Sequence, residues 1–442
     1  MEISEITIEV PVVYGHRQLL NHISATIQNQ ISSEQIPIRF VMSETNASVY
    51  KCELALLTGL QENQGAHLTS IFDFSKRAFE NTDRFNAVLL VPTGIGCAIG
   101  GHAGDATPMA RMLASVCDTL ITHPNVVNAS DMNEIPENGL YVEGSVITRL
   151  MMGTCGLLPV RANRVLVVID EHPSPLYTWG AINSVSAARA TLGISCPAVV
   201  CMDPPVLVRS IYAPSGRAVG SVEQMEGLMK ILAQYKGQFD ALAISTQIAT
   251  PDIDPVKYYK SKGAMINPWG GVEALLTHAL SSVLQLPTAH SPMFTSTFEN
   301  TSLSEVNVNV LDPRMAAEVI SLSFFICVLK GLMRSPKIIH SLSNAPKNVI
   351  TATDISCLII PDGCIGLPVL AALEQGIKVI AVKENQNIMR NNLKSLPWGQ
   401  DQFFLVNNYW EAVGVMAAIR QGLDPFSVRR PLANTLVQNV KL

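Results

Sequence analysis

One segment, residues 86–123, constrains the fold more than any other part of the chain. It reads NAVLLVPTGIGCAIGGHAGDATPMARMLASVCDTLITH, an apolar strand, a glycine-rich loop, a helix and a second strand in direct succession. This order is typical of α/β proteins, in which helices connect parallel strands and cover the sheet. Because glycine has no Cβ atom, such a loop lets backbone N–H groups approach a ligand. The segment predicts an α/β fold with a small-molecule site after its first strand.

Strand-like and helix-like segments alternate along the rest of the chain. Apolar strands are expected at 164–170, 197–202 and 240–245, and helices at 179–192, 222–235, 272–284 and 313–333. The pattern predicts an α/β fold class with parallel or mixed sheets flanked by helices, in two or more Rossmann-like domains.

A second unit of strand, loop, helix and strand occupies residues 357–382, CLIIPDGCIGLPVLAALEQGIKVIAV. Pro368 suits the first turn of its helix and Gly376 suits the end. Both units follow the first strand with proline, a polar residue and glycine, at 92–94 and at 361–363. An internal duplication and a chance similarity between two βαβ units both remain open.

The length of 442 residues exceeds the roughly 250–300 residues at which a single core stops growing, so several domains are expected. We predict an N-terminal α/β segment (1–80), a Rossmann-like domain with the glycine-rich loop (81–250) and a second α/β domain with the C-terminal βαβ unit (251–442). Hydrophobic residues make up 48% of the chain and charged residues 15%. This balance indicates extensive burial and favours a homo-oligomer.

Charge and cysteine usage restrict the partners and the compartment. The net charge is −5 and no run of Lys and Arg occurs, so we expect no nucleic-acid partner. The first residues, MEISEITIEVPVVYGH, resemble a strand rather than a signal peptide, and no apolar run reaches the ~20 residues that span a bilayer. The nine cysteines include no C-x-x-C pair. A cytoplasmic protein with reduced, buried thiols and no membrane partner is therefore expected.

The glycine-rich loop nearly matches two nucleotide-binding motifs and fits neither. A dinucleotide fingerprint needs G-x-G-x-x-G, but the third glycine comes one residue late, and the P-loop spacing is followed by His102 instead of lysine. The helix start behind the loop still attracts anions, with Thr107 expected as its N-cap. A turn that merely needs glycine is the alternative. The predicted ligand-binding residues are Gly94, Gly96, Gly100, Gly101, Gly104, Thr107, Asn125, Asn128, Asp362 and Gly363.

Candidate catalytic side chains lie in the loop and at the ends of predicted strands, where open α/β sheets bind their ligands. A histidine beside a carboxylate can act as a general acid or base, because the carboxylate orients the ring and raises its basicity. Each histidine taken singly could instead be a loop residue or a hydrogen-bonded core imidazole. The predicted catalytic residues are His102, Asp105, His123, Asp170 and His172.

Metal and cofactor binding stay undetermined. His102, His123 and His172 with an aspartate would suit zinc, iron or manganese, but no H-E-x-x-H motif occurs. Glu273 and His278 are five residues apart and do not share a helix face well.

The sequence favours an enzyme that acts on a small anionic or phosphorylated metabolite by acid–base chemistry, with the anion held at the glycine-rich loop. Two alternatives stay open. One is a non-catalytic protein that binds a nucleotide or metabolite or builds an assembly, and the other is a metal-dependent hydrolase or lyase.

Three stretches carry a resemblance to a known family: GCAIGGHAGDATPMARMLAS, THPNVVNASDMNEIPENGLYVEGS and IPDGCIGLPVLAALEQGIKVIAVKEN. From about residue 80 onward the chain resembles an uncharacterised family of cyanobacteria and plants that is described as a domain of unknown function. Such a family implies neither a reaction nor catalytic residues.

Overall fold

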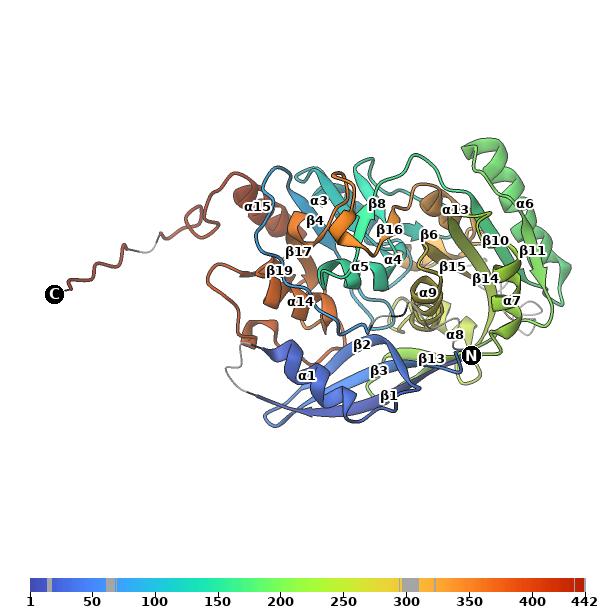
Figure 1. The fold of residues 1–442 in the computed structure, drawn as a ribbon, viewed down its shortest axis with the longest axis horizontal. Helices are drawn as coiled ribbons and strands as arrows, with labels where there is room; N and C mark the ends of the chain where they lie inside the picture. Colours follow the sequence, from blue (N-terminus) through green and yellow to red (C-terminus); the bar gives the residue numbers. More distant parts are fainter. Residues whose placement is uncertain are drawn as a thin grey trace.

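The computed structural model describes residues 1–13, 18–60, 68, 70–293, 295, 310–321, 323–432 and 434–440. Their strands form a six-stranded sheet, a ten-stranded sheet and two small two-stranded sheets. Figure 1 shows the six-stranded sheet, with β4, β17 and β19, on the left and β10, β11 and β14 of the ten-stranded sheet on the right. The mixed α/β class predicted from the sequence is confirmed.

The six-stranded sheet is parallel throughout and runs in the order β20-β19-β17-β4-β5-β8. Numbered along the chain within this sheet, the order is 6-5-4-1-2-3. This is a circular permutation of 3-2-1-4-5-6, the order of doubly wound dinucleotide-binding folds, with β17 in the place of the first strand. From β4 the chain adds strands outward to one edge of the sheet, and from β17 it adds strands outward to the opposite edge. Their bounds are β4 (Asn86–Leu89), β5 (Thr119–Thr122), β8 (Gly139–Tyr141), β17 (Ile355–Pro361), β19 (Lys378–Val382) and β20 (Phe403–Val406).

The two βαβ units that share a sequence design lie side by side at the centre of this sheet. One joins β4 to β5 through α3 (Thr107–Ala114), and the other joins β17 to β19 through α14 (Leu367–Gln375). Pro368 lies in the first turn of α14, and Gly376 ends the helix at φ 70°, as predicted. The first strands of the two units, β4 and β17, are direct parallel neighbours.

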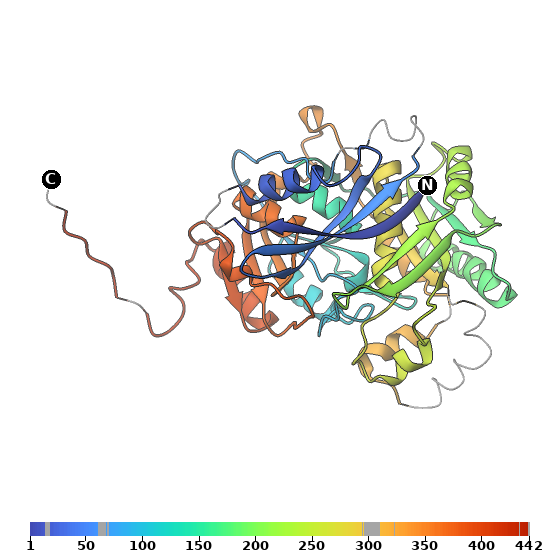
Figure 2. The same cartoon turned by 90° about the horizontal axis from the view of Figure 1, so that it is seen from below.

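The ten-stranded sheet has a parallel part and an antiparallel part. The parallel strands are β10 (Val165–Asp170), β11 (Val199–Met202), β14 (Ala241–Ala249) and β15 (Thr288–Met293). β12 (Leu207–Tyr212) pairs in parallel with β14. From β12 the sheet continues with antiparallel pairs through β13 (Ala218–Glu223), β1 (Glu2–Pro11), β3 (Val49–Thr58) and β2 (Ile36–Thr45) to β18 (Ile365–Gly366). Figure 2 shows β1, β2 and β3, in blue, crossing in front of both halves of the molecule.

These sheets do not follow the three predicted segments. Strands from residues 86–141 pair with strands from residues 355–406, and strands from residues 165–249 share a sheet with β1, β2 and β3. The short strand β18, which follows β17, pairs with β2 and so ties the two large sheets together. The chain crosses between its two halves several times.

Most helices lie where the sequence predicts them. The helix expected at 179–192 is α6 (Pro175–Leu192), which ends at Gly193, and the helix expected at 272–284 is α9 (Gly270–Leu284). The other helices, 3₁₀ turns and short strands are α1 (Leu19–Gln28), α4 (Pro124–Val127), α5 (Gly144–Met151), α8 (Pro255–Lys260), α15 (Tyr409–Arg420), η2 (Leu342–Asn344), η3 (Ala352–Asp354), η4 (Leu393–Ser395), β6 (Asn128–Ala129), β7 (Met132–Asn133), β9 (Gly156–Leu158) and β16 (Lys337–Ile339).

Two predicted helices are wrong in extent. The segment 222–235 begins as the end of β13 and becomes α7 (Glu226–Gln234) only after a turn at Gln224. The single helix expected at 313–333 is three pieces: α12 (Pro313–Ala316), η1 (Ala317–Val319) and α13 (Ile326–Met333). The break has a physical cause, because the Asp131 carboxylate accepts the N–H groups of Phe325 at 2.7 Å and Ile326 at 2.8 Å and starts a new helix there.

Among the helices in the described ranges, none has both the length and the apolar character needed to cross a bilayer. All nine cysteines are free, and seven of them are buried, whereas Cys196 is half-buried and Cys201 is exposed.

Candidate functional site

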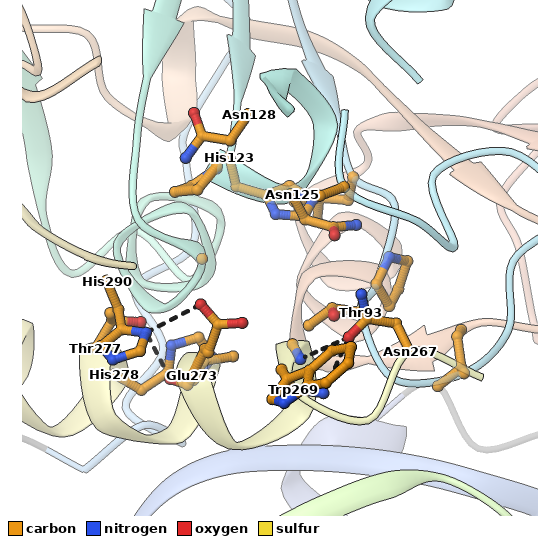
Figure 3. Close-up of a pocket in the computed structure, with 18 of the residues that line it drawn as sticks. Thr93, His123, Asn125, Asn128, Asn267, Trp269, Glu273, Thr277, His278 and His290 are labelled. Atoms are coloured by element: carbon orange, nitrogen blue, oxygen red, sulfur yellow. Dashed lines mark hydrogen bonds and ion pairs between the residues drawn. The ribbon is translucent and has the colours of Figure 1, made fainter. Parts of the chain in front are cut away.

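A cavity of about 300 Å³ lies between the two large sheets. One wall consists of the segments that follow the carboxyl ends of β4, β5, β8 and β17, and the other comes from β2, α9, β15 and α13. The cavity therefore lies at the crevice where the strand order of the doubly wound sheet reverses, the usual ligand position in such folds. Figure 3 shows His123, Asn125 and Asn128 facing Glu273, Thr277 and His278 across the opening.

His123 follows β5 directly and lines the cavity as a neutral imidazole. The backbone N–H of Val91 donates to its Nε2 at 3.1 Å. Because a backbone N–H can only donate, Nε2 is unprotonated and the proton of the neutral ring is on Nδ1. Burial lowers the pKa of His123 to about 4. His123 thus has an N–H group on Nδ1, and no side chain among the described residues accepts a hydrogen bond from it.

His278 of α9 is held by Glu143, which follows β8. The Nδ1 atom of His278 is hydrogen-bonded to Oε1 of Glu143, while Oε2 accepts the Ser145 N–H at 2.9 Å and caps α5. Burial alone would raise the pKa of Glu143, but the charge and hydrogen bond of His278, with the Ser145 hydroxyl, lower it to about 2. Because this carboxylate only accepts, Nδ1 of His278 has a proton, and Nε2 has a lone pair whenever the ring is in its neutral form.

A second histidine–glutamate pair lies further along the same wall. Nδ1 of His290, in β15, lies 2.9 Å from Oε2 of Glu273, and its Nε2 lies 2.8 Å from the Thr246 hydroxyl. Both ring nitrogens are therefore engaged within the protein. His290 fixes Glu273 at the cavity wall rather than offering a free nitrogen to a ligand.

Glu318, between α12 and α13, is a third carboxyl at the cavity. It accepts hydrogen bonds from the Ala103 N–H at 2.9 Å, the Tyr258 hydroxyl at 2.9 Å and the Asn267 amide at 3.0 Å. Burial raises the pKa of Glu318 to about 7, in spite of these donors. The pKa of Glu318 is therefore shifted in the opposite direction from that of Glu143.

Two arginines at the floor of the cavity are charge-balanced within the protein. Arg39 of β2 pairs with Glu5 and donates to the Gly271 carbonyl at 2.9 Å, and Arg217 pairs with Glu53. Much of the remaining wall is apolar: Phe40, Val41, Leu90, Ile95, Trp269, Phe324, Val328, Ile360, Ile365 and Met389.

Of the predicted site residues, His123, Asn125 and Asn128 line this cavity. The Asn125 amide donates to the carbonyl of Gly100 at 2.8 Å and so holds the glycine-rich loop, and the Asn128 amide donates to the Tyr141 hydroxyl at 2.8 Å.

His102 and Asp105 lie behind the cavity wall. Nδ1 of His102 lies 2.7 Å from the Tyr258 hydroxyl, and burial lowers the pKa of His102 to about 4. The Asp105 carboxylate accepts the Gly100 N–H within its own loop, and burial raises its pKa to about 7. Of this loop, Ala103 reaches the cavity, together with Thr93 and Ile95.

Asp170 and His172 are brought to the other sheet, at the end of β10. Asp170 accepts the N–H groups of Val206 at 3.3 Å and Gln247 at 3.1 Å, and burial raises its pKa to about 7. The His172 ring accepts the Ser174 N–H at 2.9 Å. Neither residue belongs to the cavity lining, so the structure does not bring the five predicted catalytic residues together.

The predicted N-cap at Thr107 is wrong. Its hydroxyl donates to the Val126 carbonyl at 3.0 Å, and α3 begins after Ala106 without a side-chain cap. The hydroxyl is therefore used to attach α3 to α4.

Close packing explains several loop glycines. Gly100 has φ 83°, and a Cβ there would lie 2.5 Å from the Val91 side chain; a Cβ on Gly94 would lie 2.7 Å from the Ala218 carbonyl. The N–H groups of Ile99 and Gly104 are bonded to the Asn385 side chain and the Asn125 carbonyl. Close contacts also surround the Cβ positions of Gly96, Gly101 and Gly104. Asp362 accepts the N–H of its neighbour Gly363 at 3.0 Å, beside the cavity residue Cys364.

Within the described residues, no three His, Cys, Asp or Glu side chains lie close enough together to hold a metal ion. The predicted trio of His102, His123 and His172 is divided between the cavity, the layer behind it and the other sheet.

Sequence reasoning misses the partners of His123 across the cavity. In the sequence, Glu273 and His278 of GGVEALLTH suggest only a poorly matched helix pair, but each pairs with a residue outside α9. Glu143 directly follows a strand-like segment, GLYV, so the rule that locates His123 could find it as well.

Comparison with known proteins supports the resemblance. The model of a family described as "Protein of unknown function (DUF3326)" matches residues 86–429. An uncharacterised lipoprotein of Synechococcus sp. is 35% identical over 342 residues, covering 77% of this chain and 92% of the relative. No solved structure matches the chain significantly. The chain therefore belongs to the DUF3326 family of proteins of unknown function.

Proposed function

We propose that this protein is an enzyme that binds a small metabolite with a carbonyl or similarly polarised oxygen in the cavity and acts on it by acid–base chemistry. One observation carries the proposal: His123 and His278 line the same cavity with complementary free groups. His123 has an N–H donor on a neutral ring, and His278 in its neutral form has a lone pair on a ring that a buried carboxylate orients.

The two rings divide the chemistry between them. Nε2 of His278 takes a proton from the metabolite, and the Glu143 carboxylate stabilises the resulting imidazolium. The Nδ1–H group of His123 donates to the oxygen on which negative charge develops. A neutral imidazole suits this role, because it polarises the oxygen without first giving up its own proton.

The ligand class predicted from the sequence, a small anionic or phosphorylated metabolite, remains part of the proposal. Once His278 has taken a proton, both rings have N–H donors at the cavity, which favours a carboxylate or phosphate next to the reacting atom. The volume suits a small metabolite, being at the lower end of the roughly 300–1,000 Å³ of ligand pockets. The apolar wall would cover its carbon skeleton.

Proton exchange with heavy water tests the proposal even while the reaction product is unidentified. The full-length protein is incubated in D₂O with a panel of small keto acids, hydroxy acids and sugar phosphates, and deuterium incorporation is followed by NMR and mass spectrometry. We expect exchange in at least one compound and a loss of about 10²–10⁴-fold in His278→Gln. His172→Gln, which changes a histidine outside the cavity, is the matched control.

Three results are decisive. Exchange that His278→Gln leaves unchanged would refute the assigned base. Binding of a compound without any exchange or turnover would favour the alternative of a non-catalytic metabolite-binding protein. Exchange that a chelator abolishes and zinc, iron or manganese restores would favour the metal-dependent alternative.

We also propose a cytoplasmic homo-oligomer. The nine free cysteines support a reducing compartment. The Synechococcus relative is named a lipoprotein, so recovery of the native protein in the membrane fraction would contradict the location. Light scattering of the purified protein tests the oligomer.

A further inference from the structure

We propose that Glu318 is the proton donor of this cavity and that Tyr258 and His102 connect it to the outer side of the wall as a proton relay. The inference rests on the proposed function, because it assigns the acid that complements the base His278. Nothing in the family description assigns a role to these residues.

The relay is a continuous chain of short hydrogen bonds. The Tyr258 hydroxyl donates to Oε2 of Glu318 at 2.9 Å, and Nδ1 of His102 lies 2.7 Å from the same hydroxyl. Since the single hydroxyl proton is used toward Glu318, Nδ1 of His102 donates to the tyrosine oxygen. Tyr258 is fully buried and His102 is nearly so.

The two ends of the chain face different surroundings. Glu318 lines the cavity, whereas His102 interacts with the charges of Asp312 and Arg314, whose side chains are partly exposed. Three separate elements hold the chain together: the glycine-rich loop, α8 and η1. The chain of hydrogen bonds therefore connects Glu318 in the cavity lining with His102 in the layer behind the lining.

Glu318 is placed to act opposite His278. Its partner Asn267 accepts the N–H groups of Trp269 and Gly270 and so fixes the start of α9. His278 lies eight residues further along the same helix, about 12 Å from Gly270 at 1.5 Å per residue. A metabolite lying along α9 would meet a base at one end and an acid at the other.

The charges around Glu318 keep it close to the point of proton exchange. Burial raises its pKa most, with the nearby Glu273 carboxylate adding to the rise, and its three hydrogen-bond donors oppose it. Asp105 and the Asp312–Arg314 pair lie behind it near His102, and Tyr258 and Tyr259 face it from α8. Burial raises the pKa of Tyr258 well above its usual range, so the tyrosine passes a proton on without remaining ionised.

In each cycle the relay delivers one proton from solvent to Glu318, His278 returns one proton to solvent, and no electron is transferred. Glu318 gives its carboxyl proton to the metabolite while His278 takes one from it. A proton from solvent binds at Nε2 of His102, and the ring gives its Nδ1 proton to the tyrosine oxygen as the Tyr258 hydroxyl proton passes to the Glu318 carboxylate. His278 releases the proton that it took to solvent through the cavity, and rotation of the Tyr258 hydroxyl and the His102 ring restores the starting state. Such a site suits a reaction that removes one proton and adds another, such as an isomerisation or the elimination of water.

The test uses full-length protein without substrate, so its failure is separate from a failure of the deuterium exchange assay. Glutamate is labelled with ¹³C at the side-chain carboxyl and titrated by NMR. We expect one glutamate to titrate near pH 7, and this signal to be absent in Glu318→Gln. Tyr258→Phe removes a donor to the carboxylate and should raise the midpoint. Absence of such a signal in the wild type would overturn the proposal.

The relay itself is tested by the rate at which Glu318 changes protonation after a pH jump, followed by its carboxylic acid infrared band. We expect Tyr258→Phe and His102→Gln to slow this rate by about tenfold or more. Tyr259→Phe, the matched control, removes a neighbouring hydroxyl that is outside the chain and should leave the rate unchanged. Equal rates in wild type and Tyr258→Phe would show that Glu318 exchanges protons through the cavity and would refute the relay.

Discussion

At the scale of single residues, the Glu143–His278 pair connects stability with the proposed chemistry. The pKa of Glu143 falls from 4.5 to about 2 on folding. A carboxyl whose pKa is depressed in the folded state stabilises the protein above the unfolded pKa, and this contribution is lost as the pH falls toward the folded pKa. We expect Glu143→Gln to lower the free energy of unfolding at neutral pH by on the order of 3 kcal/mol, measured by urea unfolding. The difference from wild type should shrink between about pH 4.5 and pH 2.

The matched control is Glu134→Gln, whose side chain is 64% exposed and which should change stability little. A loss of unfolding free energy in Glu143→Gln that stays constant down to pH 2 would contradict the lowered pKa of Glu143.

The same pair shows what a sequence can reveal about a site. His123 is predictable because it follows a strand directly, but Glu143 and His278 are 135 residues apart and meet only when the two sheets pack. No local pattern encodes that contact.

At the scale of elements, the long-range cap of α13 decides where a helix begins. Asp131 accepts two backbone N–H groups of α13 and the hydroxyls of Ser321 and Ser323. Removing a helix N-cap costs about 0.5–2 kcal/mol, and the four donors to this partly buried carboxylate place it at the upper end. We expect Asp131→Ala to lower the free energy of unfolding by about 2 kcal/mol. Asp131→Asn, which retains one acceptor oxygen, should lose less, both measured by chemical denaturation.

Asp252→Ala, at an exposed position, is the control and should change stability by less than about 0.5 kcal/mol. Equal stabilities of Asp131→Ala and wild type would mean that α13 does not depend on this cap.

Helices whose ends are marked by a nearby residue are predicted well from the sequence, as α6 is by Gly193 and α14 by Gly376. The apolar run over 313–333 has no such signal, because its interruption comes from a carboxylate nearly two hundred residues earlier in the chain.

At the scale of the whole molecule, each of the two large sheets combines strands from segments that lie far apart in the sequence. Local strand patterns in the sequence predict most of the parallel strands but not which strands pair, because pairing depends on packing between segments far apart. The fragment 81–250 contains β4, β5 and β8 without their partners β17, β19 and β20, and β10 and β14 without β15. We expect this fragment, expressed alone, to lack a cooperative thermal transition and a dispersed amide NMR spectrum, because its strand faces and edges are left exposed.

Removal of residues 431–442 is the matched truncation, because it shortens the chain without opening a sheet. In this segment Leu432, Leu436, Val437 and Val440 are 57–80% exposed, and Figure 1 shows the C-terminal end extending away from the body. Phe426, which stacks on Phe404 at 5.7 Å, and Arg429, which pairs with Glu411, are both retained. We expect this truncated protein to keep the Tm of the full chain within about 2 °C, by calorimetry. A large fall in Tm would show that the C-terminal segment packs on the protein in solution, and a simultaneous fall in the mass measured by light scattering would place that packing between subunits.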